Sequence, residues 1–413
     1  CKKDIQQGSQ ESSPAGCGGT SSSGCRRNWR RARLIPERKP RAHRPVRFFS
    51  TLMSYWIIDS HEDLAYNVLA FGRDYLLSAA ETRAREAGGP TPQRNGDTLL
   101  GWPDYQRGRV GLVFATLFAT PRRYAESWDV QSYATFAQGR AHFRDQLEVY
   151  LRLWGEHPDK FQPVLNRRQL ASVLQPWQQP QAETDQPPVG MLVLMEGAEA
   201  LEMPEELVEY WERGVRMVGP VWAGTRYCGG TREHGGFTKD GRRLLELMAE
   251  LGLILDLSHM TEQSALEALD LFPGPIVASH ANARAVLRDG GERQLTDRVL
   301  QRLIERDGVI GVVPLNQFLR PGILKSDPRR DTPLDWLAVH IDHICQLAGD
   351  ARHVGIGTDF DGGFGVQHVP PELDTIADMQ KLVPLLSQRG YTPQDVQAIL
   401  AARGRSLNWR RGT

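Results

Sequence analysis

The sequence has few cysteines and no long hydrophobic run. Five cysteines among 413 residues are too few for a small secreted domain held together by disulfides. No apolar stretch approaches the roughly 20 residues that a membrane-spanning helix needs. Hydrophobic residues make up 40% of the chain and aromatic residues 8%, which excludes a mostly disordered protein. We therefore expect a soluble globular protein, long enough for one barrel-type domain.

The chain carries no net charge, with 50 basic and 50 acidic side chains, but the charges are unevenly distributed. Residues 1–50 hold twelve Lys and Arg against three acidic residues and lack helical or strand periodicity. We interpret residues 1–52 as a disordered basic extension and residues 53–413 as one folded domain. The extension is either a nucleic-acid tether or transit peptide, or, as we favour, sequence that precedes a true start at Met53 and is not native.

The segment after Met53 alternates short β-branched runs with longer amphipathic stretches, a pattern typical of βα units around a parallel sheet. We predict eight strands, at residues 55–60, 110–118, 191–195, 216–221, 253–257, 275–279, 309–315 and 353–358. The predicted helices are residues 139–154, 205–214, 240–251, 261–269, 297–306, 333–349 and 392–402. Residues 165–188, rich in Gln and Pro, are predicted to form a loop insertion.

Eight βα units predict an α/β fold of the (β/α)8 or TIM-barrel type. A doubly wound open sheet is the alternative. Such a sheet more often has a glycine-rich phosphate-binding turn after its first strand, whereas this chain has Asp59-Ser-His-Glu-Asp-Leu64 there. The sequence therefore favours the barrel.

Metal-binding residue types follow five of the predicted strands: His61 and Asp63, Glu196, His259, His280, and Asp359. We expect these six side chains to converge, because the carboxyl ends of barrel strands meet around one mouth. Imidazole and carboxylate ligands suit Zn²⁺ or a similar cation. Six ligands exceed the four of one tetrahedral zinc, so the pattern predicts two cations bridged by one carboxylate and a hydroxide.

A two-cation site of this kind predicts metal-assisted hydrolysis of an amide or related acyl bond. The cations lower the pKa of a bound water and polarise the carbonyl, and a nearby carboxylate can carry the proton to the leaving amine. Other nucleophiles fit poorly, because no G-x-S-x-G elbow is present and Cys228 and Cys345 lie in no recognisable Cys-His context. Singly, each residue is a weak signal, since Asp359-Phe-Asp-Gly362 could form an ordinary turn.

Five motifs lie between Asp59 and Gly362. They are Asp59-Ser-His-Glu-Asp-Leu64, Met195-Glu-Gly-Ala198, Leu255-Asp-Leu-Ser-His259, Ala278-Ser-His-Ala-Asn282 and Val354-Gly-Ile-Gly-Thr-Asp-Phe-Asp-Gly362. Together they resemble the membrane (renal) dipeptidase family, the binuclear zinc dipeptidases of the amidohydrolase superfamily. The segment Trp222-Ala-Gly-Thr-Arg-Tyr-Cys-Gly-Gly-Thr231 looks like the bacterial branch of that family.

The resemblance implies two zinc ions per chain, with the folded domain 53–413 as a metal-dependent hydrolase. By that resemblance, His61 and Asp63 would bind the first zinc. His259 and His280 would bind the second. Glu196, together with a hydroxide, would bridge the two ions.

The resemblance also implies roles in catalysis and substrate binding. Asp359 would be the catalytic proton shuttle, and Arg293 would hold the substrate carboxylate, a task that suits a guanidinium fork. Trp222 and Tyr227 are predicted to contact the substrate. Trp222 stands where mammalian members of the family carry a histidine that polarises the substrate, so carbonyl stabilisation would come from a metal or another donor.

We therefore expect a cytoplasmic binuclear zinc dipeptidase that acts on short peptides, with D- or non-standard C-terminal residues among its candidate substrates. One alternative is an N-acyl-amino-acid or lactam hydrolase that uses the same two-metal site. Another is a metal-holding binding protein without turnover, which Trp222 would permit. The expected partners are a small-molecule or dipeptide substrate and, as in many family members, a second copy in a homodimer. We expect no nucleic-acid partner and no membrane association.

Overall fold

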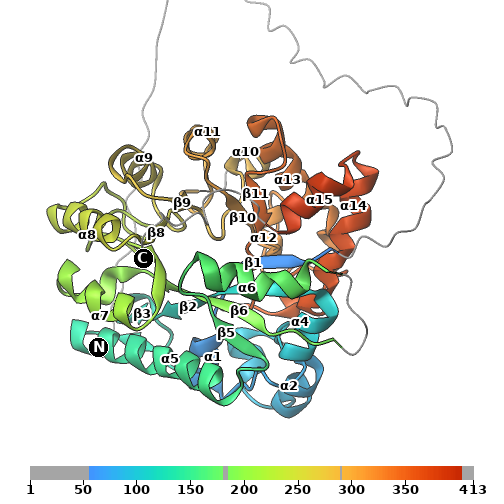
Figure 1. Cartoon of the computed structure of the whole chain (residues 1–413), viewed down its shortest axis with the longest axis horizontal. Coiled ribbons are helices and arrows are strands. Elements are labelled where there is room, and N and C mark those ends of the chain that lie inside the picture. The colour runs from blue at the N-terminus through green and yellow to red at the C-terminus, as the bar shows by residue number, and fades with distance from the viewer. Residues whose placement is uncertain (1–54, 180–184, 289–290, 402–413) are drawn as a thin grey trace, which may run out of the picture. The chain divides into compact units, whose positions relative to one another are not determined.

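The computed structural model describes residues 55–179, 185–288 and 291–401, so the predicted basic extension at 1–52 lies outside the described residues. Eight parallel strands form a nearly closed barrel with helices around the outside (Figure 1). In spatial order they are β10 (Ile310–Val312), β11 (Val354–Ile356), β1 (Ile57–Glu62), β2 (Val110–Phe118), β6 (Val189–Glu196), β7 (Val215–Gly219), β8 (Ile254–Asp256) and β9 (Ile276–Val277). A parallel bridge between Ala278 and Ile310 joins the two ends of this order. The predicted barrel and all eight predicted strands are confirmed.

The longest pair of strands, β2 and β6, shows why these residues form a barrel wall. Every residue of β6 is buried, and so are all but the last residue of β2. Near-continuous apolar runs of this kind are typical of parallel strands covered on both faces. The two strands pair in register from Leu112 opposite Gly190 to Phe118 opposite Glu196. The register places Phe118 and Glu196 side by side at the carboxyl end of the barrel.

Three further short strands lie outside the ring of eight. β5 (Phe161–Pro163) pairs in parallel with the first residues of β6. β3 (Thr120–Pro121) and β4 (Ser132–Tyr133) pair with each other in the loop that follows β2. Since that loop leaves the carboxyl end of β2, residues 119–133 lie at the end of the barrel where active sites of this architecture form.

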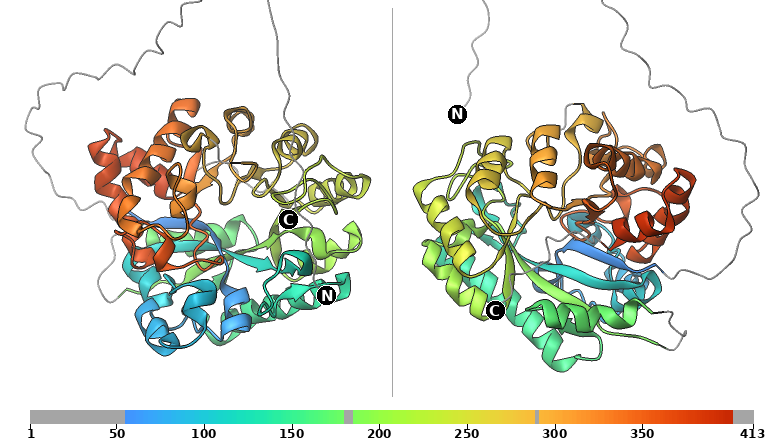
Figure 2. Two further views of the ribbon diagram at one scale, coloured as in Figure 1. Left: turned by 180° about the vertical axis from the view of Figure 1, so that it is seen from behind. Right: turned by 45° about the horizontal axis from the view of Figure 1, so that its top comes forward.

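The predicted helices are confirmed as α5 (Phe136–Glu156), α7 (Leu207–Glu212), α8 (Lys239–Glu250), α9 (Glu262–Leu271), α11 (Asp297–Glu305), α13 (Asp335–Ala348) and α15 (Pro393–Leu400). Others were not predicted, namely α1 (Leu64–Phe71), α2 (Ala79–Glu86), α3 (Thr91–Asn95), α4 (Trp102–Gly108), α6 (Arg167–Trp177), α10 (Arg284–Leu287), α12 (Asn316–Leu319) and α14 (Leu382–Gln388). The views from behind and from above show helices on all sides of the strands (Figure 2). Among the helices described, none is both long and apolar enough to cross a membrane.

The loop predicted at 165–188 is wrong in its first half, which forms α6. The Asn166 side chain caps this helix by accepting from the backbone N–H three residues later, at 3.0 Å. The buried face of α6 ends in Trp177, whose ring packs over β2 at Gly111. A Cβ at Gly111 would lie 2.9 Å from the indole Cγ, so glycine is needed for this close approach. The segment was predicted to be a loop because Gln and Pro are abundant in it, although its apolar residues form one short face of a helix.

Candidate metal centre

All six predicted metal-site side chains lie at the carboxyl ends of the barrel strands. They are His61 and Asp63 at the end of β1, Glu196 at the end of β6, His259 after β8, His280 after β9 and Asp359 after β11. Five of the six residues are buried, with exposed fractions of at most 9%, and Asp359 is nearly so. The convergence expected from the strand pattern is therefore present.

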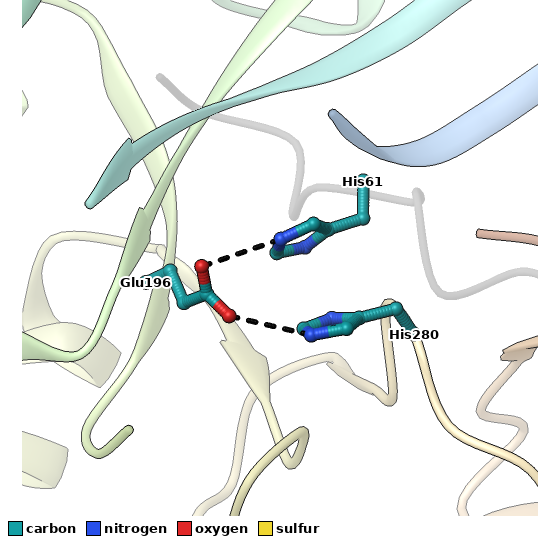
Figure 3. Close-up of side chains that lie close together, drawn as sticks. All are labelled: His61, Glu196 and His280. Carbon is teal, nitrogen blue, oxygen red and sulfur yellow. Dashed lines mark ion pairs between the residues drawn. The ribbon is translucent and has the colours of Figure 1, made fainter. Parts of the chain in front are cut away.

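The two oxygens of the Glu196 carboxylate face different histidines (Figure 3). Its Oε2 lies 3.3 Å from Nε2 of His61. Its Oε1 lies 2.9 Å from Nε2 of His259 and 3.3 Å from Nε2 of His280. One carboxylate thus stands between two separate sets of nitrogen atoms.

The His61 side of Glu196 carries two more carboxylates. Nε2 of His61 lies 4.0 Å from Oδ2 of Asp63 and 3.8 Å from Oδ1 of Asp359. Within the described chain this nitrogen has no hydrogen-bond partner, although it is fully buried. A buried nitrogen surrounded by carboxylate oxygens and left without a partner fits a metal ligand.

The hydrogen bonds of Ser279 fix the tautomers of two of these histidines. The Ser279 hydroxyl donates to Oδ2 of Asp256 at 2.5 Å, so its oxygen is left to accept. Nδ1 of His280 lies 2.8 Å from this oxygen, and Nδ1 of His61 lies 3.3 Å from it. We therefore assign the proton of each imidazole to Nδ1, which leaves the lone pair of each Nε2 pointing into the site.

The third histidine is oriented in the same way by Thr231. The Thr231 hydroxyl donates to the backbone oxygen of His259 at 3.3 Å, and its oxygen lies 3.0 Å from Nδ1 of that imidazole. Nε2 of His259 is then also an unprotonated acceptor, and it lies only 3.0 Å from Nε2 of His280. Lone pairs that face one another and the Glu196 carboxylate repel each other unless a cation lies between them. The donor set therefore fits bound cations.

Burial shifts the pKa values of these groups toward their uncharged forms. Desolvation raises the pKa of Glu196 to about 8, and desolvation together with repulsion from Glu196 raises that of Asp63 to about 7. Desolvation also raises the pKa of Asp359 well above its ordinary range. The pKa values of His259 and His280 are lowered well below the usual value by the same cause. Bound cations would reverse the carboxylate shifts, because they favour the ionised form.

Arg293, the predicted carboxylate-binding residue, lies beside the metal ligands. Its Nη1 donates to the backbone oxygen of His280 at 2.9 Å, and its guanidinium lies over the ring of Phe318, 5.3 Å from the centroid. Its Nη2 is buried and has no partner among the described residues. This leaves a fixed N–H group without an acceptor of its own, which a substrate carboxylate could supply.

A cavity of about 580 Å³ opens over the metal ligands. Glu196, Asp359 and Arg293 line it, as does Trp222, whose ring centroid lies 6.0 Å from that of His259. The predicted substrate contacts Arg293 and Trp222 are therefore in place to meet a ligand. A dipeptide fills only part of this volume, so the cavity has room for large side chains.

Tyr227 is not brought into this cavity, contrary to its prediction as a substrate contact. The residue is fully buried, and its hydroxyl donates to the backbone oxygen of Leu201 at 2.8 Å. Its ring is covered by the guanidinium of Arg226, 4.7 Å from the centroid. The Tyr227 side chain therefore packs against the segment around Leu201, whereas Trp222, five residues earlier in the same loop, lines the cavity.

Sequence reasoning missed Asp361, which lies two residues after Asp359 and lines the same cavity. Its Oδ2 accepts hydrogen bonds from Tyr75 at 2.6 Å and Thr98 at 2.7 Å, and it lies 2.9 Å from Nη1 of Arg73. The sequence offered no signal for this, because Thr98 is 263 residues away. Gly362 follows directly, and a Cβ there would lie 2.7 Å from Oδ2 of Asp63.

The sequence profile of the family described as membrane dipeptidase (peptidase family M19) matches residues 47–403. An uncharacterized protein in the pqqA 5′ region of Klebsiella pneumoniae is 33% identical over 215 residues, which cover 49% of this chain and 75% of that protein. Dipeptidase aclJ of Aspergillus oryzae is 24% identical over 349 residues, which cover 83% of this chain and 75% of that protein.

The fold is similar to that of a metallo peptidase from Rhodobacter sphaeroides, whose crystal structure is liganded with a phosphinate mimic of the dipeptide L-Ala-D-Ala. The TM-score is 0.67 at 22% sequence identity, and the match covers 86% of this chain and 99% of the other. At this level of identity the likeness concerns the fold.

Proposed function

The chain belongs to the membrane dipeptidase family and is a metallo-dipeptidase of that family, and from this premise we propose that it hydrolyses short peptides at a site holding two zinc ions. The observation that supports two ions most strongly is the position of Glu196. One of its oxygens faces His61, and the other faces His259 and His280. A carboxylate that faces two ligand sets in this way suits a bridging role.

The ligand sets follow from the same contacts. His61 and Asp63 would hold the first zinc, His259 and His280 the second, and Glu196 would bridge them. Zinc held by these residues would supply Lewis-acid chemistry, lowering the pKa of a coordinated water and polarising the peptide carbonyl.

Arg293 and Trp222 would position the substrate. The free Nη2 of Arg293 would bind the C-terminal carboxylate of the peptide, which sets the distance to the bond that is cut. Trp222 would provide an apolar surface beside His259. Since a relative binds a mimic of L-Ala-D-Ala, peptides with a C-terminal D-residue belong to the proposed substrates.

Asp359 would move the proton. Its carboxylate lies beside His61 and Asp63, and its backbone N–H donates to the His61 backbone oxygen at 3.0 Å. Its backbone φ of 58° holds a non-glycine residue in the left-handed region, a strain often found at functional sites. From this position its carboxylate can accept the proton of the attacking water and pass it to the leaving amine.

Elemental analysis combined with a peptide panel tests the proposal. The full chain should carry about two zinc ions, and it should hydrolyse dipeptides such as L-Ala-L-Ala or L-Ala-D-Ala. Chelation should abolish turnover, and zinc should restore it. Bound zinc without turnover of any dipeptide, N-acyl amino acid or lactam would contradict the proposal and favour a binding protein. Turnover of N-acyl amino acids alone would favour the N-acyl-amino-acid hydrolase.

A cytoplasmic location, a homodimer and the absence of nucleic-acid partners and membrane association stay predictions. Light scattering during gel filtration measures the mass in solution. A mass of about twice 46.4 kDa is expected for the dimer.

A further inference from the structure

The cavity over the metal ligands contains a buried carboxylate that the proposed chemistry does not use. Asp129 lies between β3 and β4, in the loop after β2, and lines the same cavity as Glu196 and Arg293. Its exposed fraction is only 5%. In the part of the chain described, no Lys, Arg or His lies within ion-pair distance of its carboxylate. A buried carboxylate without a cation is costly, so its partner is expected to come from a ligand.

The two oxygens of Asp129 differ in what they bind. Oδ1 accepts from the hydroxyl of Tyr66 at 2.8 Å and from the backbone N–H of Gln131 at 2.9 Å. No described residue donates to Oδ2. The carboxylate is therefore held in place by one oxygen, which leaves the other available to a ligand in the cavity.

Tyr66 connects this carboxylate to the metal end of the cavity. It follows Asp63 by three residues on α1, and its ring lies 5.8 Å from that of Phe118. Burial raises the pKa of Tyr66 above its ordinary value, and the charges of both Asp129 and Asp63 contribute to this rise. Asp129 and the metal ligands Asp63 and Glu196 therefore line one cavity, and Tyr66 joins Asp129 to the helix that begins after Asp63.

The aromatic side chains of this part of the cavity already face cations of the chain itself. Trp128 and Tyr124 line the cavity, and Arg123 and Arg232 lie over the Tyr124 ring, 5.1 and 5.8 Å from its centroid. Arg94 also lines the cavity, and its guanidinium lies over the Trp128 ring, 5.5 Å from the centroid. The cavity thus offers a half-buried cation with a free N–H at Arg293 and a buried anion with a free oxygen at Asp129.

We propose that Asp129 binds a cationic nitrogen of the substrate residue on the amino side of the bond that is cut. This inference rests on the proposed dipeptidase function and narrows its substrate class. The nitrogen is either the free α-ammonium group or a side-chain ammonium group, since both present the same chemistry to the carboxylate. Peptides that carry such a group are preferred over N-acylated amino acids.

Four substrates and two variants test the inference. L-Ala-L-Ala and its N-acetyl derivative differ in the α-ammonium group, whereas L-Lys-L-Ala and L-norleucyl-L-Ala differ in the side-chain ammonium group. Asp129→Asn keeps an oxygen for Tyr66 and Gln131 but removes the charge. Glu126→Gln is the matched control, because Glu126 is an exposed carboxylate at the rim of the same cavity.

If the α-ammonium group binds, Asp129→Asn lowers kcat/KM for L-Ala-L-Ala by about 30-fold, mainly through KM, as expected when a buried charge pair is lost. N-acetyl-L-Ala-L-Ala then changes by less than about 3-fold on the same scale. If the side-chain ammonium group binds, Asp129→Asn lowers kcat/KM for L-Lys-L-Ala by about 30-fold, and kcat/KM for L-norleucyl-L-Ala is not lowered in this way. Glu126→Gln leaves all four rates within about 3-fold of the wild type.

An equal loss for all four substrates would show that Asp129 only supports the loop, and no loss for any of them would show that it has no role. Either outcome overturns the inference. Should Asp129→Asn fail to fold, the wild-type enzyme can still overturn the inference. It should prefer L-Ala-L-Ala over the N-acetyl derivative, or L-Lys-L-Ala over L-norleucyl-L-Ala, by about 30-fold, and equal rates within both pairs would contradict it. Wild-type enzyme with zinc that cleaves the N-acetyl derivative as fast as the free peptides overturns the inference but not the hydrolase site. No turnover of any of the four defeats the proposed function and this inference with it.

Discussion

Two clusters of buried charge lie next to each other at the mouth of the barrel, and they balance their charge differently. The metal-ligand cluster consists of His61, Asp63, Glu196, His259, His280 and Asp359. The Asp361 cluster consists of Arg73, Tyr75, Glu86, Thr98 and Asp361. In the second cluster every carboxylate has a cation or donors from the chain itself, since Arg73 pairs with both Asp361 and Glu86 at 2.9 Å. In the metal-ligand cluster, histidine nitrogens and carboxylate oxygens that can only accept hydrogen bonds face one another.

The difference shows that two aspartates of one short motif can have different roles. Asp359 and Asp361 are the same residue type, two positions apart and both close to Asp63. Asp361 is neutralised by Arg73 and held by Tyr75, so it contributes to stability. Among the described residues no arginine pairs with Asp359, whose carboxylate lies beside His61, so this carboxylate stays open to the proton of the attacking water.

The largest expected effect is on catalytic activity, and it distinguishes Asp359 from Asp361. Asp359→Asn should lower kcat by about 1000-fold, because the proton carrier is lost. The variant should still bind two zinc ions and unfold at the same denaturant concentration as the wild type. Turnover assays, elemental analysis and denaturation curves measure these three quantities. Full activity in this variant would remove the proposed role of Asp359.

The next largest effect is on the free energy of unfolding, and it distinguishes Asp361 from Asp359. Asp361→Asn should lower the free energy of unfolding by about 3 kcal/mol with or without zinc, because Arg73 is left buried without its main counter-charge. Asp374→Asn is the matched control, since Asp374 pairs with Arg83 on the surface and such pairs contribute less than about 1 kcal/mol. Equal stability losses in the two variants would mean that burial does not distinguish these pairs.

Metal removal should make stability depend on pH through Glu196. Its pKa is about 8 in the folded protein, against an ordinary value of 4.5. Between about pH 6.5 and 8.5 the folded state holds a proton that the unfolded chain has lost, so the free energy of unfolding falls by about 2 kcal/mol as pH rises. His259 and His280 are neutral in the folded state, whereas in the unfolded chain they still bind protons near the ordinary pKa of 6.5, so they oppose the fall at the lower end of this range.

Denaturation curves at several pH values, with zinc and with chelator, measure this effect. Zinc should remove the part due to Glu196, because a bound cation keeps the carboxylate ionised. Glu199 is not a ligand, and burial raises its pKa to about 7, so its smaller contribution should persist with zinc. The same pH dependence with and without zinc would indicate that Glu196 binds no metal.

The smallest effect concerns the hydrogen bond that orients His259. Thr231→Val removes the hydroxyl next to Nδ1 of this imidazole, and zinc affinity should fall about 10-fold. Thr231→Ser keeps the hydroxyl and should restore the affinity. Competition with a chromophoric chelator measures both variants. Equal affinities in the two would show that Thr231 does not orient the ligand.

The parts predicted from the sequence are those with a local pattern. Buried parallel strands appear as apolar runs, and the residues that follow them were predicted to converge because of the barrel geometry alone. The position of Trp222 at the cavity was predicted from the family resemblance. Tyr227 was placed wrongly, because a loop position does not tell which way a side chain points.

The missed parts depend on contacts between distant segments. Nothing in Asp359-Phe-Asp-Gly362 distinguishes the two aspartates, since Arg73 and Thr98 approach Asp361 only in the folded chain. Asp129 looks like an ordinary loop residue, and only the cavity and the absence of a cation near it make it noteworthy. The helix Arg167–Trp177 was missed because its packing on β2, and not its composition, stabilises it.

Diffraction from crystals of the zinc-loaded protein, recorded at the zinc absorption edge, tests the two-ion site most directly. We predict two anomalous peaks on opposite sides of the Glu196 carboxylate, one next to His61 and Asp63 and the other next to His259 and His280. A single peak, or peaks that do not flank Glu196, would contradict the account.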